Sequence, residues 1–140
     1  MKELHTLDVS NGKYTNVRIK AAENFILNFV SNGVDHFVPI HLIAGVEIWA
    51  GEYDKKWIES IEKSDDKQTD NCESSPLKGF FSPLVGKSQV DFNTLAEQLN
   101  DVMNAAVIGL NESLVVLSTR DIVFVVALSS ISDVSNIKNN

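Results

Sequence analysis

The stretch that decides the fold runs from Val90 to Leu128, VDFNTLAEQLNDVMNAAVIGLNESLVVLSTRDIVFVVAL, because its hydrophobic spacing is the most regular in the chain. In its first half, apolar residues recur three and four positions apart, which predicts an amphipathic helix over Asp91 to Ile108. Asp91 would cap the start of this helix, and Gly109 would end it. The predicted buried face consists of Phe92, Leu95, Ala96, Leu99, Val102, Met103 and Ala106.

The second half of this stretch predicts a C-terminal hairpin. Leu114 to Leu117 and Ile122 to Leu128 are rich in β-branched residues, and Ser118 to Asp121 between them suits a type I turn. The strand from Ile122 to Leu128 is apolar on both faces, which is typical of a central strand covered on two sides. The helix would cover one side, and a partner subunit is a candidate for the other.

Two Ser-Asn-Gly triplets, Ser10 to Gly12 and Ser31 to Gly33, predict two N-terminal hairpins, because Asn and Gly both tolerate positive φ. The first hairpin joins Leu4–Val9 with Lys13–Lys20. The second joins Phe25–Val30 with Val34–Leu42, in a register that places Phe29 opposite His36. Pro39 has no N–H to donate to a further strand, so Val34–Leu42 is expected to be an edge strand or to bulge.

The remaining segments complete a single domain over residues 1–140. Asp54 to Lys63 predicts a short helix, residues 64–78 have the composition of a flexible insertion, and the chain from about residue 130 reads as a frayed tail. The predicted fold class is therefore α+β. We expect an antiparallel sheet of about six or seven strands packed by one long and one short helix.

Charge and cysteine content restrict the function classes. Twelve Lys and Arg against nineteen Asp and Glu give a formal net charge of −7, which disfavours general binding to nucleic-acid phosphates or anionic membranes. DNA mimicry is compatible with this acidity. Cys72 is the one cysteine, so no intramolecular disulfide can form, and no window reaches the roughly 18 apolar residues of a membrane span. A cytoplasmic location is expected.

No motif predicts catalysis, a metal or a cofactor. His36 and His41 fall on opposite strand faces without a Cys or carboxylate at ligand spacing. Cys72 lies in the predicted insertion, where no histidine would be held beside it. The tripeptide from Gly86 to Ser88 ends like a phosphate-binding loop, but the preceding Gly79 is too far away. We therefore expect a protein that is not an enzyme.

Aromatic and basic residues supply the candidate binding sites. Trp49 and Tyr53 flank a predicted strand-to-helix junction, where a ring can remain half exposed and can anchor an interface or stack on a planar ligand. Phe80 and Phe81 lie in a predicted loop. The remaining candidates are polar side chains, namely His41, Lys87 and Arg120, the last two as contacts for a phosphate.

These observations favour a non-catalytic binding protein that acts by occupying a partner, in the manner of an inhibitor, an immunity-type protein or a small regulatory protein. The edge strand at Val34–Leu42 and the doubly apolar strand at Ile122–Leu128 further predict a homo-oligomer, a dimer or larger. The alternative is a protein that binds or sequesters a nucleotide-like small ligand. An acidic DNA mimic is the third hypothesis.

Overall fold

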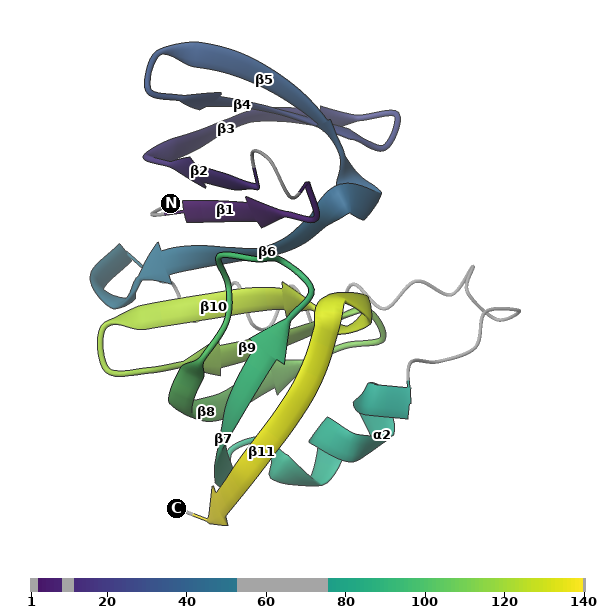
Figure 1. Cartoon of the computed structure of the whole chain (residues 1–140), viewed down its shortest axis with the longest axis vertical. Coiled ribbons are helices and arrows are strands. Elements are labelled where there is room, and N and C mark those ends of the chain that lie inside the picture. Colours follow the sequence, from purple (N-terminus) through teal and green to yellow (C-terminus); the bar gives the residue numbers. More distant parts are fainter. Residues whose placement is uncertain (1–2, 9–11, 53–75, 140) are drawn as a thin grey trace.

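The fold is almost entirely antiparallel β-sheet (Figure 1). The structure is a computed structural model, and it describes residues 3–8, 12–52 and 76–139. Its strands are β1 (Glu3–Thr6), β2 (Lys13–Thr15), β3 (Val17–Glu23), β4 (Ile26–Ser31), β5 (Val34–Pro39), β6 (Ile43–Trp49), β7 (Ser88–Thr94), β8 (Val102–Leu110), β9 (Leu114–Ser118), β10 (Ile122–Ala127) and β11 (Ile131–Asn139). The helical segments in these ranges are α2 (Pro76–Phe81) and the 3-10 turns η1 (Ile40–Leu42), η2 (Ala50–Glu52), η4 (Ser82–Leu84) and η5 (Leu128–Ser130).

Eight strands form one sheet in the order β11-β7-β8-β9-β10-β6-β1-β2, and β3-β4-β5 form a second sheet. The two sheets are continuous through the backbone, because Asn16 alone separates β2 from β3 and bends the chain with a φ of 51°. Asparagine is one of the few residues that adopt this left-handed conformation at low cost.

The predicted α+β fold class is wrong, because no long helix packs on the sheet in the part of the chain that the structure describes. Asp91 to Ile108 forms β7, a loop and β8. In β7 every second residue from Ser88 to Thr94 is buried, which is the period of a strand and not of a helix. The polar members of that alternation, Asp91 and Asn93, are poor helix formers, and each accepts a backbone N–H from across the β7–β8 connection.

The loop between β7 and β8 explains the helix-like spacing. Thr94 accepts a hydrogen bond from the Ala96 N–H and donates to the Leu99 carbonyl at 2.7 Å, and Asn100 binds three backbone groups of the loop. This network turns Ala96 and Leu99 inward, where they are 1% and 2% exposed. The apolar spacing that predicted a helix face therefore comes from a folded-back loop.

Two of the three predicted hairpins lie wholly within the described residues, and both are confirmed. β4 pairs with β5 in the predicted register, with Phe29 opposite His36, and the turn at Asn32 and Gly33 has φ values of 51° and 81°. β9 pairs with β10, and β10 is central between β9 and β6. β1 also pairs with β2, although the turn predicted at residues 10–12 lies partly outside the described residues. β5 lies at the edge of its sheet, as predicted.

Three other predictions have different outcomes. The polar segment after residue 130 is not a frayed tail but the nine-residue strand β11, which pairs along β7. Within the predicted insertion at residues 64–78, Pro76, Leu77 and Lys78 belong to α2, whereas 64–75 lie outside the described residues. The predicted short helix at 54–63 lies wholly outside them.

The chain contains a structural repeat that the sequence analysis did not reveal. Every pairing of β1 with β6 recurs 88 residues later between β7 and β11, including the bulge after His5, which recurs after Asn93. The pairings of β3, β4 and β5 likewise recur in β8, β9 and β10. Asn16 also has its counterpart in Asn104, with a φ of 56°.

We call residues 3–49 the first repeat and residues 88–139 the second repeat. Figure 1 shows them above and below the line where β6 and β10 lie side by side. The repeats are identical at only six of the described positions, which are the pairs Thr6/Thr94, Leu7/Leu95, Asn16/Asn104, Val38/Val126, Ile43/Ile131 and Val46/Val134.

The two repeats are joined into one sheet by the antiparallel pairing of β6 with β10, from Trp49 opposite Ile122 to Gly45 opposite Val126. The joint is apolar on one face, where Ile48, Val116 and Val123 are almost fully buried. Gly45 permits close packing on this joint, because a Cβ there would lie 3.1 Å from both the Leu99 side chain and the Val125 carbonyl.

Gly45→Val is expected to lower the free energy of unfolding by about 2 kcal/mol, since the added atoms would force β6 from β10. Chemical denaturation monitored by tryptophan fluorescence measures this change. Gly51→Val is the matched control, because a Cβ at Gly51 meets nothing within 4 Å. Equal losses in the two variants would contradict the close approach at the joint.

Candidate functional site

The predicted binding residues do not form one site. Phe81 is fully buried in the core, and the ring of Phe80 packs edge-on against it with centroids 5.3 Å apart. Phe80 remains 37% exposed and lines a depression of about 260 Å³ with Leu77 and residues 131–134. The Phe80-Phe81 segment is thus the end of helix α2, which contacts β8, and not the loop that the sequence predicted.

Trp49 and Arg120 lie at the same end of the sheet. Trp49, at the end of β6, is opposite Ile122, and the N–H of Ala50 donates to the Asp121 carbonyl in the turn that carries Arg120. Trp49 is 46% exposed, and Arg120 is exposed. Tyr53 lies outside the described residues.

His41 and Lys87 occupy two further places. His41 is exposed in the 3-10 turn η1, between β5 and β6. Lys87 is exposed just before β7, and β8 and β9 separate that strand from β10. Of the alternative phosphate contacts, Lys87 therefore lies across the sheet from Trp49, whereas Arg120 lies at the same end as Trp49.

The structure instead gathers four exposed apolar side chains around β4 and β5, which we call the outer patch: Phe25, Ile26, Phe37 and Ile40. Their exposed fractions are 86%, 42%, 67% and 42%. Ile26 and Phe37 share one face of the hairpin, because Phe37 lies opposite Asn28, two residues from Ile26, and both line one depression. Phe25 and Ile40 lie at the end of the same hairpin, where the Ile40 N–H donates to the Phe25 carbonyl. Exposed apolar side chains gathered at one hairpin are a candidate interaction surface.

A depression of about 280 Å³ opens within the outer patch. It is lined by Ile26, Phe37 and four neighbours, namely Ala21, Glu23, Asn24 and Asn28. The Oδ1 atom of Asn28 is buried and has no hydrogen-bond partner among the described residues. An unsatisfied buried acceptor destabilises the free protein and can be satisfied by a donor on a bound partner.

Phe25 is held in a strained backbone conformation. It follows Asn24 in the two-residue turn between β3 and β4, where the φ values are 54° and 64°. Asparagine tolerates such a φ, but a bulky residue at this φ is an outlier. The second repeat makes the equivalent turn without positive φ, because Asn111 accepts the N–H groups of Ser113 and Leu114. The fold therefore does not require a strained phenylalanine here.

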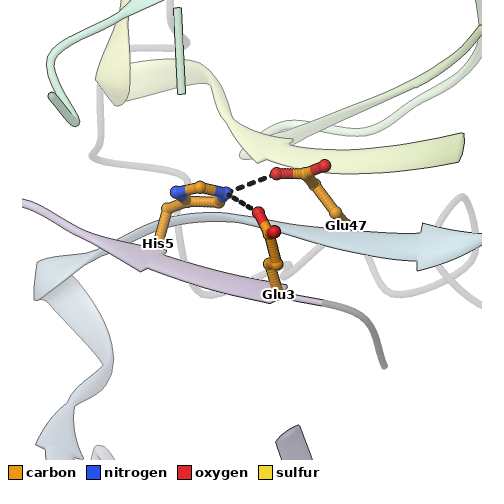
Figure 2. Close-up of side chains that lie close together, drawn as sticks. All are labelled: Glu3, His5 and Glu47. Carbon is orange, nitrogen blue, oxygen red and sulfur yellow. Dashed lines mark hydrogen bonds and ion pairs between the residues drawn. The ribbon is translucent and has the colours of Figure 1, made fainter. Parts of the chain in front are cut away.

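A cluster of ionisable side chains from β1 and β6 surrounds the buried His5 (Figure 2). Glu3 and Glu47 are directly opposite each other, and both carboxylates point to the Nε2 atom of His5, at 3.4 and 2.5 Å. His5 is fully buried, and Lys13 lies 3.4 Å from the other oxygen of Glu3. Two like charges opposite each other destabilise a sheet unless a cation lies between them.

The three donor atoms lie within 4.8 Å of one another, which is close enough to hold a metal ion. A histidine that binds a metal normally donates its second ring N–H to a neighbouring acceptor. His5 Nδ1, however, is buried without a partner among the described residues. We therefore assign the cluster a structural role, in which His5 bridges the two carboxylates and fixes β1 on β6.

The sequence analysis missed both of these places for identifiable reasons. Phe25 was interpreted as an ordinary strand residue. Phe37, which the predicted register already places on the outer face, was not recognised as part of a binding surface. The alternation of Glu3 and His5 on one strand face was a usable signal. Glu47, which completes the cluster, could not be connected to them without knowing that β1 pairs with β6.

Comparisons with known proteins find no family model, no curated protein and no solved structure that matches the chain. Among the described residues, no helix has the length and apolar character needed to cross a membrane.

Asp91, the counterpart of Glu3 in the second repeat, connects three strands. Its carboxylate accepts the backbone N–H of Asn104 on β8 at 2.8 Å and the side-chain N–H of Asn136 on β11 at 2.7 Å. The Asn104 N–H, then Asn136 and the charge of Lys138, hold the pKa of Asp91 below its usual value. A lowered folded-state pKa means that the ionised carboxylate stabilises the fold.

Asp91→Asn is expected to lower stability at neutral pH, and the difference from the wild type should vanish as the pH falls. The ionised Asp91 carboxylate contributes fully to the free energy of unfolding above its unfolded-state pKa of about 4. This contribution is lost as the pH falls through its lower folded-state pKa. Urea midpoints at pH 7, 5, 4 and 3 measure it. Asp121→Asn controls for the loss of one charge, and a pH-independent Asp91→Asn difference would contradict the assignment.

His5→Ala is expected to lower the free energy of unfolding by about 3 kcal/mol, because it leaves Glu3 and Glu47 facing each other without the bridging ring. Adding Glu47→Gln to His5→Ala should restore part of the loss, which a double-mutant cycle measures. The control is a metal titration of the wild type after chelation. A rise in melting temperature with Zn²⁺ or Mn²⁺ that His5→Ala abolishes would contradict the structural role.

Proposed function

We propose that this chain is a non-catalytic binding protein that self-associates and acts by occupying a protein partner through the outer patch. The observation that carries the proposal is Phe25, which is 86% exposed at a φ of 64°. Both features destabilise the free protein, and strained residues of this kind concentrate at binding and catalytic sites. The inhibitor, immunity-type and regulatory classes all share this mode of action.

The chemistry of the outer patch supports a protein partner. A shallow apolar surface with one unpaired buried acceptor suits an aromatic or aliphatic anchor from the partner, accompanied by a single N–H donor to Asn28 Oδ1. The net charge of −7 disfavours nucleic acids as the partner. The single Cys72 supports a location in the cytoplasm.

The nucleotide-binding hypothesis receives less support. It relied on an aromatic ring stacking on a base while Lys87 or Arg120 met a phosphate. Trp49 and Arg120 do lie at one end of the sheet, but Trp49 is at the end of β6 and Lys87 precedes β7, three strands beyond β10. We therefore propose the protein-binding function alone.

Phe25→Gly is expected to stabilise the fold and to abolish partner binding. Removing the strained phenylalanine relieves about 1–3 kcal/mol of backbone strain. Glycine has more conformational freedom in the unfolded chain, which costs about 0.5–1 kcal/mol. The free energy of unfolding should therefore rise by about 1 kcal/mol. Denaturation measures the gain. Binding is measured with immobilised protein and an extract of the source cells, by quantifying the proteins that the wild type retains and the variant does not.

Met103→Ser is the matched control, because Met103 is 62% exposed on β8 of the second repeat, away from the outer patch. It should leave the retained proteins unchanged. If Phe25→Gly and Met103→Ser retain the same proteins as the wild type, the outer patch is not the binding surface. If Phe25→Gly destabilises the fold, Phe25 is a structural residue and the argument from strain fails.

A further inference from the structure

The joint between the two repeats is built from two particular strands. With β2 and β3 together counted as the counterpart of β8, the two repeats share one strand order. The last strand pairs with the first, and the strand before the last, β5 or β10, lies at the opposite end. β6, the last strand of the first repeat, pairs with β10, the strand before η5 in the second repeat. The chain therefore already contains one example of how two such repeats bind side by side.

The other two strands of these types have no partner on their outer edges. β11, the counterpart of β6, pairs with β7 alone in the part of the chain that the structure describes, and β5, the counterpart of β10, pairs there with β4 alone. Each presents a row of backbone N–H and C=O groups, which is a template for a further strand. These two unpaired edges are therefore the counterparts of the two strands that form the internal joint.

We propose that β5 of one copy of this protein pairs, antiparallel, with β11 of the next copy and so repeats the β6–β10 joint between molecules. This inference rests on the proposed self-association and specifies its geometry. The contact is heterologous, since two different edges meet, so it leads to a closed ring or to a filament and not to a symmetric dimer.

The internal joint fixes the register of the proposed contact. The turns η1 and η5 match in their flanking backbone angles and in the hydrogen bond that closes each turn, and they lie 88 residues apart. If β5 takes the place of β10 and β11 takes the place of β6, the pair Val125–Val46 becomes Phe37–Val134. The neighbouring pairs become Val38–Asp133 and His36–Ser135.

The residues at this contact suit the proposed partner. Val125, the counterpart of Phe37, packs against the apolar cluster of the internal joint, whereas Phe37 is 67% exposed. The register places no two like charges opposite each other. Pro39 does not interfere, because its counterpart Ala127 lies just beyond the paired part of β10.

The test uses cysteine pairs in a Cys72→Ser background, at positions before the bulge that β11 carries between Ser135 and Lys138. Directly opposite residues of antiparallel strands have Cα atoms about 4.5–5.5 Å apart, within the range of a disulfide. Phe37→Cys with Val134→Cys, and separately His36→Cys with Ser135→Cys, should yield a ladder of covalent oligomers on non-reducing gels. Phe37→Cys with Ser135→Cys is the out-of-register control and should cross-link at least tenfold less.

Mixing the two single variants distinguishes the two kinds of contact. Phe37→Cys and Val134→Cys proteins, each unable to cross-link with itself, should form a covalent heterodimer when mixed. Covalent dimers of Phe37→Cys alone would overturn the head-to-tail geometry. Circular dichroism and reduction of the gel samples establish that each variant is folded and that its ladder is disulfide-bonded.

The native mass of the wild type separates this inference from the function on which it rests. An oligomer by light scattering, together with the in-register ladder, supports both. An oligomer without that ladder overturns the β5–β11 contact and leaves self-association standing. A monomer across a hundredfold range of concentration overturns self-association and this inference together, but leaves partner binding by the outer patch to its own test.

Discussion

The structure depends on the backbone pairing of β6 with β10, because this pairing joins the two repeats into one sheet and leaves neither strand as an exposed edge. Each repeat taken alone would expose a long apolar edge with Val123 or Ile48 on it. Pairing buries both side chains and satisfies the backbone groups of both strands. Ser130 reinforces the joint by donating its hydroxyl to the Ala44 carbonyl. The remainder of the fold is arranged around this line of hydrogen bonds.

The sequence predicted those parts of the fold that local chemistry determines. Asn32 and Gly33 define the β4–β5 turn because few residues accept positive φ, and the register follows from that turn. The long helix was predicted wrongly because Ala96 and Leu99 belong to a loop whose hydrogen bonds, made by Thr94 and Asn100, come from residues that a periodicity count treats as neutral. The pairing of strands distant in sequence determined the structure of this segment, and the local spacing of its apolar residues did not.

The repeat escaped detection because it is conserved in backbone geometry and hardly at all in residue identity. A β-strand constrains the alternation of burial and not the particular side chain, so Leu4 and Phe92 or Phe29 and Leu117 occupy equivalent core positions. Only the residues with special backbone conformations, such as Asn16 and Asn104, reveal the correspondence directly. The candidate site was missed for a different reason. The β4–β5 register was predicted correctly, but the positive φ and the 86% exposure of Phe25 were not.

Differences between the two repeats indicate where function departs from the requirements of the fold. At the turn before the third strand, the second repeat uses Asn111 to bind two backbone N–H groups, whereas the first repeat carries the strained Phe25. Where the first and last strands of each repeat pair, Asp91 in the second repeat accepts hydrogen bonds from Asn104 and Asn136. The first repeat instead buries His5 between two glutamates. The same backbone is stable with either set of side chains. The fold alone therefore does not explain why the first repeat carries the set that destabilises it more. His5 is buried between β1 and β6, where we assign its cluster a structural role, and the strained, exposed Phe25 is the difference on which the proposed binding surface rests.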